Sequence, residues 1–324
     1  MSVKYYSVFL LTLILTNCDQ SQKSKGIKDQ MIESFTNIDS SGREIKFQNV
    51  QDVNNTGGHL QGVQVFKSGN LEYVILTGSS STYSYYSIVK MGDKNEVLSV
   101  NKLLDKPYKH AGGFQVFENL MAVGIEDDEA KDKSKVFLFE ILDPNHPPKE
   151  PIAIIERNGE IERATAGCIG LIKIQDKILL VVGDWDTKHL DFYLMDYLEL
   201  NKDENAFELV FTIDTKKTNK DLWIDKIWPP YQNINILKDQ EDNLYLVGFA
   251  SDESNEEDVA DLYEIETLHL KKFQLKKLAT KRFKKKNTST FRWGAGVDQI
   301  NQKALRIISC EKTLQKLSIL TVYR

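Results

Sequence analysis

The chain alternates between short turns of small or polar residues and apolar runs that predict β-strands. Five times, a six-residue turn opens such a run, and consecutive copies lie about fifty to sixty residues apart. The copies are residues 59–64 (HLQGVQ), 110–115 (HAGGFQ), 165–170 (TAGCIG), 230–235 (PYQNIN) and 293–298 (WGAGVD). Self-similarity at such a period is typical of repeated supersecondary units, and short strands within each unit predict propeller blades.

Each copy continues into two further apolar segments. The second segments are 71–76, 120–124, 178–182, 244–248 and 304–308, and the third segments are 85–89, 135–139, 190–194, 261–265 and 317–321. Near-continuous apolar runs are typical of strands covered on both faces. We therefore predict an all-β propeller over residues 41–324, with five blades of four antiparallel strands.

The last copy has no outer strand, because the sequence stops after its third segment. We expect residues 43–50 to pair with Leu317–Tyr323, which closes the ring with an N-terminal strand and removes an exposed edge. Six blades are the alternative, with a degenerate blade hidden in the insertion 214–228 or before residue 57.

Successive strands of an antiparallel blade run in opposite directions. The six-residue turns and the turns after the second strands are therefore expected at the same end of the propeller, here called the mouth. Ligand sites in closed β-folds favour such ends. Gln64, Gln115, Asn235 and Asp298 occupy one aligned inner-strand position. The candidate ligand-binding residues are His59, Gln64, His110, Gln115, Asp127, Asp186, Tyr231, Asn235, Arg292, Trp293 and Asp298.

Structural roles compete with ligand binding at many of these positions. The glycines of the turns fit close packing and positive φ, which we favour over a functional role. Amide and carboxylate side chains at a repeated position also tie neighbouring strands through backbone hydrogen bonds, and we favour that role for Gln64 and its equivalents. His59 and His110 fit blade packing and ligand contact equally well.

Acidic turns at the mouth allow two further kinds of chemistry. Paired carboxylates hydrolyse glycosides when they stand at the right separation, and the candidates are Asp127, Asp186, Asp252 and Asp298. The oxygens of Glu126, Asp127, Asp128, Asp184 and Asp186 are of the kind that Ca²⁺ takes. The sequence has no EF-hand loop, no metalloprotease helix and no nucleophile elbow. We interpret the acidic turns as solvated and expect no cofactor or metal, with Ca²⁺ as the weaker alternative.

The N-terminus has the pattern of a secretory signal. Lys4 precedes the apolar run 8–15, which is too short to span a bilayer as a helix. Residues 15–18 (LTNC) resemble the lipobox of bacterial lipoproteins, which implies a signal peptide over residues 1–18 and a lipid on Cys18. Asn17 departs from the small residue usual there. The expected location is the bacterial cell envelope, held on a membrane through the lipid, with the inner membrane, outer membrane and cell surface all open.

Composition limits the partners. Residues 19–40 are polar and predict a flexible tether. The net charge of −5 argues against a general nucleic-acid binder. The one strongly basic run, 271–286, is interpreted as an outermost strand whose lysines prevent edge-to-edge pairing. Cys168 and Cys310 lie in strand-like runs and are expected to be buried and unpaired.

The segment 138–148 (LFEILDPNHPP) resembles the third-strand phrase of LVIVD-repeat propellers. The openings at 110–115 and 165–170 are similar to those of uncharacterised exported propeller proteins. This resemblance implies a fold and an exported setting, without a reaction. The favoured function is a binding or scaffold module for a glycan, peptide or protein partner, and the alternative is a carboxylate-based glycosidase at the same mouth.

Overall fold

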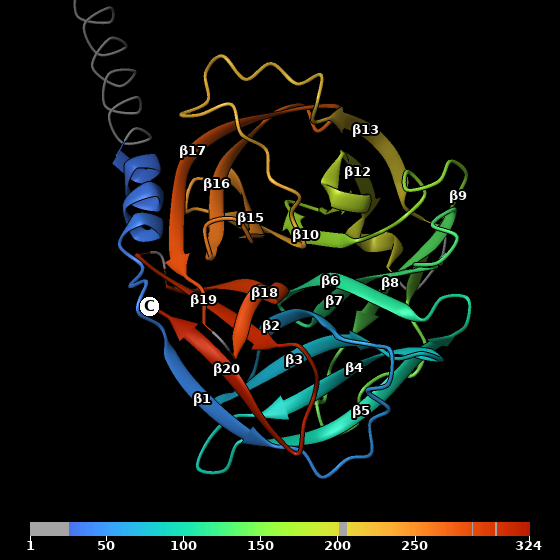
Figure 1. The fold of residues 1–324 in the computed structure, drawn as a ribbon. Coiled ribbons are helices and arrows are strands. Elements are labelled where there is room, and N and C mark those ends of the chain that lie inside the picture. The colour runs from blue at the N-terminus through green and yellow to red at the C-terminus, as the bar shows by residue number, and fades with distance from the viewer. Residues whose placement is uncertain (1–25, 201–205, 287, 302) are drawn as a thin grey trace, which may run out of the picture.

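A computed structural model describes residues 26–200, 206–286, 288–301 and 303–324. Within these residues the strands form three four-stranded sheets and one eight-stranded sheet. The eight-stranded sheet consists of two antiparallel halves that join at a single parallel pair, Gln48 with Glu96. Figure 1 shows these sheets arranged around a common centre.

The strands follow one order from the centre outward. The innermost strands are β2 (Leu60–Ser68), β6 (His110–Phe117), β10 (Cys168–Ile174), β14 (Asn233–Lys238) and β18 (Ser289–Asn301). The second strands are β3 (Leu71–Ser79), β7 (Leu120–Glu126), β11 (Lys177–Gly183), β15 (Leu244–Asp252) and β19 (Ala304–Glu311). The third strands are β4 (Tyr83–Lys90), β8 (Lys133–Glu140), β12 (His189–Asp196), β16 (Glu257–Leu268) and β20 (Leu317–Tyr323). The outer strands are β5 (Glu96–Asp105), β9 (Ala153–Asn158), β13 (Glu208–Asp214), β17 (Lys272–Lys284) and β1 (Arg43–Gln48).

The N-terminal strand belongs to the sheet of the C-terminal strands. β1 pairs antiparallel with β20, from Arg43 opposite Val322 to Gln48 opposite Leu317. The inner strands contact one another in sequence, and β18 contacts β2. Apolar clusters lie between neighbouring sheets, so each sheet is covered on both faces. This arrangement is a β-propeller, and it explains the near-continuous apolar runs of the second strands.

Glycine is required where inner strands approach closely. A Cβ on Gly296 would stand 2.1 Å from both the Val63 carbonyl oxygen and Gln64 Nε2, and one on Gly112 would stand 2.4 Å from the Gly167 carbonyl oxygen. Both distances are far inside van der Waals contact. These glycines therefore have the packing role that the sequence favoured.

The region before β1 differs from the expected tether. Residues 26–36 form a helix that lies along β17 (Figure 1), and Met31, Phe35 and Ile38 are buried against the neighbouring sheets. Met31 and Phe35 are four residues apart and lie on one helical face, and Ile38 follows the end of the helix; this pattern was hidden among the polar residues of 19–40. The predicted signal peptide and Cys18 lie outside the described residues. No helix among the described residues is long and apolar enough to cross a membrane.

The insertion between β13 and β14 is held against the sheets by its tryptophans. Trp223 Nε1 donates to the Leu275 carbonyl oxygen at 2.8 Å, and Trp228 Nε1 donates to the Thr187 carbonyl oxygen at 3.0 Å. Residues 215–232, all of them described, contain no strand. A degenerate blade is therefore not formed in this insertion.

Candidate functional site

A cavity of about 130 Å³ opens where the inner strands begin and the second strands end. We call it the mouth cavity. It is lined by His59, Gln61, His110, Glu126, Gly167, Asp184, Trp185, Asp186, Tyr231, Gln232, Arg292 and Trp293. Six of the eleven ligand-binding candidates, His59, His110, Asp186, Tyr231, Arg292 and Trp293, are among these residues.

One wall of the mouth cavity is a buried carboxylate and imidazole pair. Glu126 ends β7 and His110 begins β6, so the antiparallel register places them opposite each other. His110 Nδ1 lies 3.1 Å from Glu126 Oε1, and Glu126 Oε2 accepts the Ala166 N–H at 3.0 Å. Burial alone would lower the pKa of His110, but the contact with Glu126 outweighs it and raises the pKa. The contact with Glu126 therefore favours the protonated form of His110.

His59 stands beside this pair. Its ring centre is 5.2 Å from that of His110 and 5.4 Å from that of Trp293. Burial, followed by the charge of His110, lowers the pKa of His59 to about 4. Nδ1 lies 3.0 Å from the Leu60 carbonyl oxygen, which can only accept, so Nδ1 carries the proton and Nε2 a lone pair. The mouth cavity thus holds two neighbouring imidazoles whose pKa values are shifted in opposite directions.

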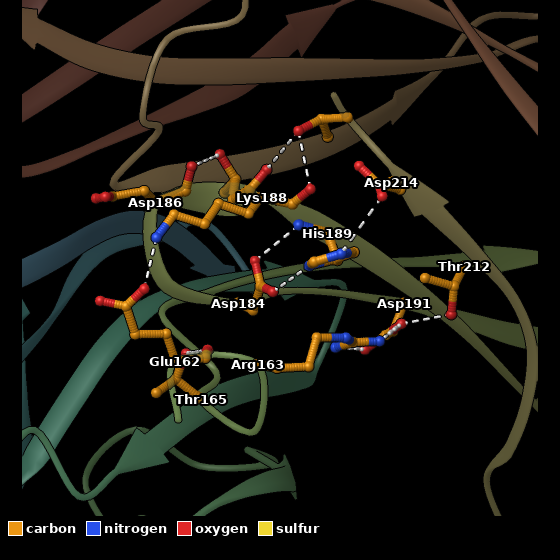
Figure 2. Close-up of polar contacts among 12 residues, drawn as sticks. Glu162, Arg163, Thr165, Asp184, Asp186, Lys188, His189, Asp191, Thr212 and Asp214 are labelled. Carbon is orange, nitrogen blue, oxygen red and sulfur yellow. Dashed lines mark hydrogen bonds and ion pairs between the residues drawn. The ribbon is translucent and has the colours of Figure 1, made fainter. Parts of the chain in front are cut away.

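The lining of the mouth cavity includes a second buried carboxylate. Asp184 follows β11, and its side chain is only 2% exposed. Oδ1 accepts the His189 N–H at 2.7 Å, and Oδ2 lies 2.6 Å from His189 Nδ1 (Figure 2). Burial raises the pKa of Asp184 above its usual value of 3.8, against the opposing effect of His189.

A strained turn follows Asp184. Residues Asp186 and Thr187 have φ of 59° and 52°. A positive φ is costly for a β-branched residue such as Thr187. Thr187 is held there because its carbonyl oxygen accepts from Trp228 and its hydroxyl accepts the Tyr231 N–H at 3.2 Å. The turn leaves the Asp186 side chain exposed at the cavity rim.

Aromatic and cationic groups surround the rim. The Trp293 ring has the Arg292 guanidinium 5.2 Å and the Lys312 ammonium 5.1 Å from its centre. The Lys131 ammonium lies 3.6 Å from the centre of the Trp185 ring. Tyr231 presents its ring, because its hydroxyl is bonded inside the blade to Asp261 at 2.5 Å.

The amide candidates lie below the mouth cavity and bridge the inner strands. Gln64 Nε2 donates to Asn235 Oδ1 at 3.0 Å, and Asn235 Oδ1 also accepts the Val297 N–H. Gln115 Oε1 accepts the backbone N–H groups of Leu171 and Ile236 at 2.8 and 2.7 Å. These side chains tie strands together, the role that the sequence favoured for them.

Asp298 does not lie at the mouth. The residue of β18 that lies beside Gln64 is Gly296, two positions before Asp298. The pairing between β18 and β19 is irregular, which shifts the register relative to the other repeats. Asp298 instead contacts Arg306 at 2.6 Å and Lys67 at 3.3 Å, and it lines a separate cavity of about 270 Å³ at the opposite end of the inner strands. The alignment that made it an equivalent of Gln64 is corrected.

Two further acidic candidates cap turns outside the cavity. Asp127 Oδ1 accepts the N–H groups of Glu129 and Ala130, and its other oxygen lies 3.4 Å from Lys133. Asp252 is likewise bonded within its own turn, to Ser254 and Asn255. Among the residues that the structure describes, no group of three His, Cys, Asp or Glu side chains is placed to hold a metal ion.

The sequence named Glu126 and Asp184 only as oxygen donors and did not single out His189. The sequence did contain a signal that could have identified the two carboxylates, because each lies at or directly after the end of an apolar second strand. Each also has a histidine at the start of a neighbouring strand. Cys168 and Cys310 are free and buried, as expected.

Comparisons with solved structures find this fold in carbohydrate-active enzymes. A GH62 hydrolase crystallised with xylotriose is 10% identical, with a TM-score of 0.50, covering 90% of this chain and 100% of that chain. A GH43_1 enzyme from Xanthomonas citri is 9% identical (TM-score 0.48, 82% and 87% covered), and the α-L-arabinofuranosidase of Podospora anserina is 8% identical (0.48, 88% and 98%). No protein-family model and no curated protein matches the chain. At such low identity the likeness shows the fold alone, a β-propeller.

Proposed function

We propose that the mouth cavity binds a carbohydrate and hydrolyses a glycosidic bond. The observation that carries the proposal is a pair of buried carboxylates, Glu126 and Asp184, that line one cavity. Glycoside hydrolysis needs one carboxyl that keeps its proton and one that stays ionised. The raised pKa of Asp184 suits the proton donor, and the second carboxyl of the cavity, Glu126, in contact with His110, is the partner.

The other groups of the cavity suit a sugar. Trp293 and Trp185 offer aromatic faces, and the amides of Gln61 and Gln232, hydrogen-bonded to each other at 2.9 Å, offer polar contacts beside them. Such a mixture of aromatic faces and a few convergent polar groups is typical of small-molecule sites. The GH62 hydrolase with xylotriose, whose fold the chain shares, adds support for a carbohydrate.

A binding module without hydrolysis is the second candidate, and one observation favours it. The four carboxylate oxygens of Glu126 and Asp184 each already contact a protein donor. Either carboxyl must give up one of these protein contacts before it can act on a substrate. The binding interpretation predicts a glycan that associates with the mouth cavity and leaves unchanged.

Hydrolysis of a panel of aryl glycosides and xylo-oligosaccharides separates the two candidates. The proposal predicts turnover that falls by about a hundredfold or more in Asp184→Asn and Glu126→Gln, the scale typical of a lost general acid or base. Asp252→Asn, in a turn at the same end outside the cavity, is the matched control and keeps the activity. Binding of an oligosaccharide without release of any product would contradict hydrolysis and support the binding module.

We infer that the propeller has five blades and that β1 completes the last of them. The support is the division of the eight-stranded sheet at the pair Gln48 and Glu96, together with the pairing of β1 with β20. Deleting residues 43–48 is expected to expose the edge of β20 and to produce aggregation at concentrations where the intact chain stays monodisperse.

The cell-envelope location remains our proposal and rests on the sequence of residues 1–18. Lys28 near the start of the described helix pairs with Glu264, toward the end of β16 farthest from the mouth. Labelling with a radioactive fatty acid tests the anchor, and Cys18→Ala is expected to abolish the label.

A further inference from the structure

His189 lies between two carboxylates that lead outward from the mouth cavity. Nδ1 is 2.6 Å from Asp184 Oδ2 on the cavity side, and Nε2 is 3.9 Å from Asp214 Oδ2 on the outer side. Figure 2 shows the three side chains in this order, Asp184 after β11, His189 at the start of β12 and Asp214 at the end of β13. The Asp184 side chain is only 2% exposed, whereas those of His189 and Asp214 are 29% and 23% exposed.

We propose that His189 is the positioning residue of the mouth cavity, which orients the Asp184 carboxylate and, with Asp214 behind it, sets how firmly that carboxyl holds its proton. The proposal deepens the proposed function and rests on it for its effect on hydrolysis. It also makes a claim about Asp184 that holds whether or not the substrate is a glycoside.

The orienting role follows from the two hydrogen bonds. The backbone N–H and the ring Nδ1 of one residue engage both oxygens of Asp184, so the plane of the carboxylate is fixed relative to β12. Because Asp184 is almost fully buried, rotation away from His189 would leave an unpaired charge in the protein interior. A donor that is pre-oriented in this way avoids an entropic cost when substrate binds.

The effect on proton affinity follows from charge. The contact with His189 Nδ1 at 2.6 Å stabilises the Asp184 carboxylate and opposes the burial that raises the pKa of Asp184. Asp214 lies on the other side of the ring, beyond hydrogen-bond distance, and also contacts Lys217 at 2.8 Å. His189 thereby keeps Asp184 from holding its proton too tightly to release it.

The other charged groups around Asp184 have partners of their own. Arg163 donates to both oxygens of Asp191 at 2.6 Å, and Lys188 pairs with Glu162 at 2.5 Å. Asp186 is exposed at the rim, and the Cys168 thiol, whose pKa burial raises well above its usual value, stays neutral. His189 is therefore the basic side chain that contacts the Asp184 carboxylate directly.

The test on activity compares two substitutions of His189. In His189→Ala the Asp184 carboxyl loses the charge and the ring donor, so the alkaline limb of the kcat/KM profile moves up by about one pH unit, a tenfold change in proton affinity. His189→Asn keeps a donor beside Oδ2 without the charge, so KM stays near wild type while the limb still moves. The matched control is His146→Asn, because His146 has the same Nδ1 contact with a carboxylate, Asp143 at 2.7 Å, but is 86% exposed. A limb that does not move in His189→Ala overturns the proposal.

A second measurement needs no activity. Carbon-13 NMR titration of the aspartate carboxyls, with the Asp184 signal assigned by its loss in Asp184→Asn, is expected to show Asp184 titrating at higher pH in both His189 variants than in wild type. An unchanged Asp184 titration overturns the positioning role. If no glycoside is hydrolysed and the titration still moves, the proposed function fails and the positioning role stands.

Discussion

Asp258 offers a direct test of how burial between the sheets controls stability. It begins β16 next to Glu257, is fully buried, and accepts a hydrogen bond from Ser251. Burial raises its pKa from 3.8 to about 6, and the nearby Glu253 acts in the same direction, while Lys285 opposes both. An acid whose pKa is higher in the folded state stabilises the fold while protonated, and this stability is lost as the pH rises from 3.8 through 6.

The shift from 3.8 to about 6 corresponds to on the order of 3 kcal/mol. Asp258→Asn keeps the acceptor for Ser251 and never ionises. The variant is therefore expected to match wild type in free energy of unfolding near pH 3.5 and to exceed it by up to this amount at pH 7. Urea unfolding followed by tryptophan fluorescence between pH 3.5 and 8 measures the difference.

Asp252, in the same β15–β16 hairpin, is the control. Hydrogen bonds from Ser254 and Asn255 lower its pKa to about 2, so its contribution is present above 3.8 and is lost only as the pH falls toward 2. The difference between wild type and Asp252→Asn should stay flat from pH 4 to 8. A flat profile for Asp258→Asn over the same range would refute the assignment of a buried, proton-retaining carboxyl.

Three further substitutions test the packing. Gly296→Ala should destabilise the folded chain by about 1–3 kcal/mol, because the added Cβ would clash with backbone atoms. Gly167→Ala, where the nearest atom to the added Cβ is 3.5 Å away, should destabilise it much less. Equal melting temperatures of the two variants would contradict the close approach at Gly296. Lys277→Ala should cost about 3–5 kcal/mol in urea unfolding, because it leaves the buried Asp261 carboxylate without its cation at 3.0 Å, and a cost below about 1 kcal/mol would contradict this. Phe35→Ala should release the N-terminal helix and speed limited proteolysis before residue 40, and unchanged cleavage would show that the helix does not depend on this side chain.

The strands were predictable because the core lies between sheets. Strands with both faces covered need apolar residues at nearly every position, so Leu120–Glu126 and Lys177–Gly183 are visible as runs without any knowledge of their partners. The pairing of β1 with β20 was also expected, from an alternating segment and an incomplete last repeat. The local apolar pattern and the number of repeats were therefore enough to predict the strands and the pairing of β1 with β20.

The remaining features depend on registers and contacts that one sequence does not display. Asp298 was assigned to the wrong end of the propeller. The pairing of β18 with β19 is irregular, so residues at the same place in the aligned repeats do not lie at the same level in the structure. The alternation of Asp191 with Tyr193 is typical of a half-exposed strand, yet Asp191 is buried and its carboxylate binds Arg157 and Arg163. Buried ion pairs of this kind mimic a surface pattern.

The site was predictable in position but only partly in content. The turns at the start of the inner strands placed His59, His110 and Trp293 at the mouth cavity. The carboxylates Glu126 and Asp184 were hidden among many acidic turn residues, because only burial distinguishes them from solvated ones such as Asp252.

The central claim is that Glu126 and Asp184 act as a pair on one carbohydrate. The most direct measurement is product release from glycosides by wild type, Asp184→Asn, Glu126→Gln and the control Asp252→Asn. Turnover by wild type and the control, reduced by about a hundredfold or more in the two cavity variants, is the predicted result. Turnover that survives in Asp184→Asn and Glu126→Gln, or a glycan that binds the mouth cavity and is never cleaved, would contradict it.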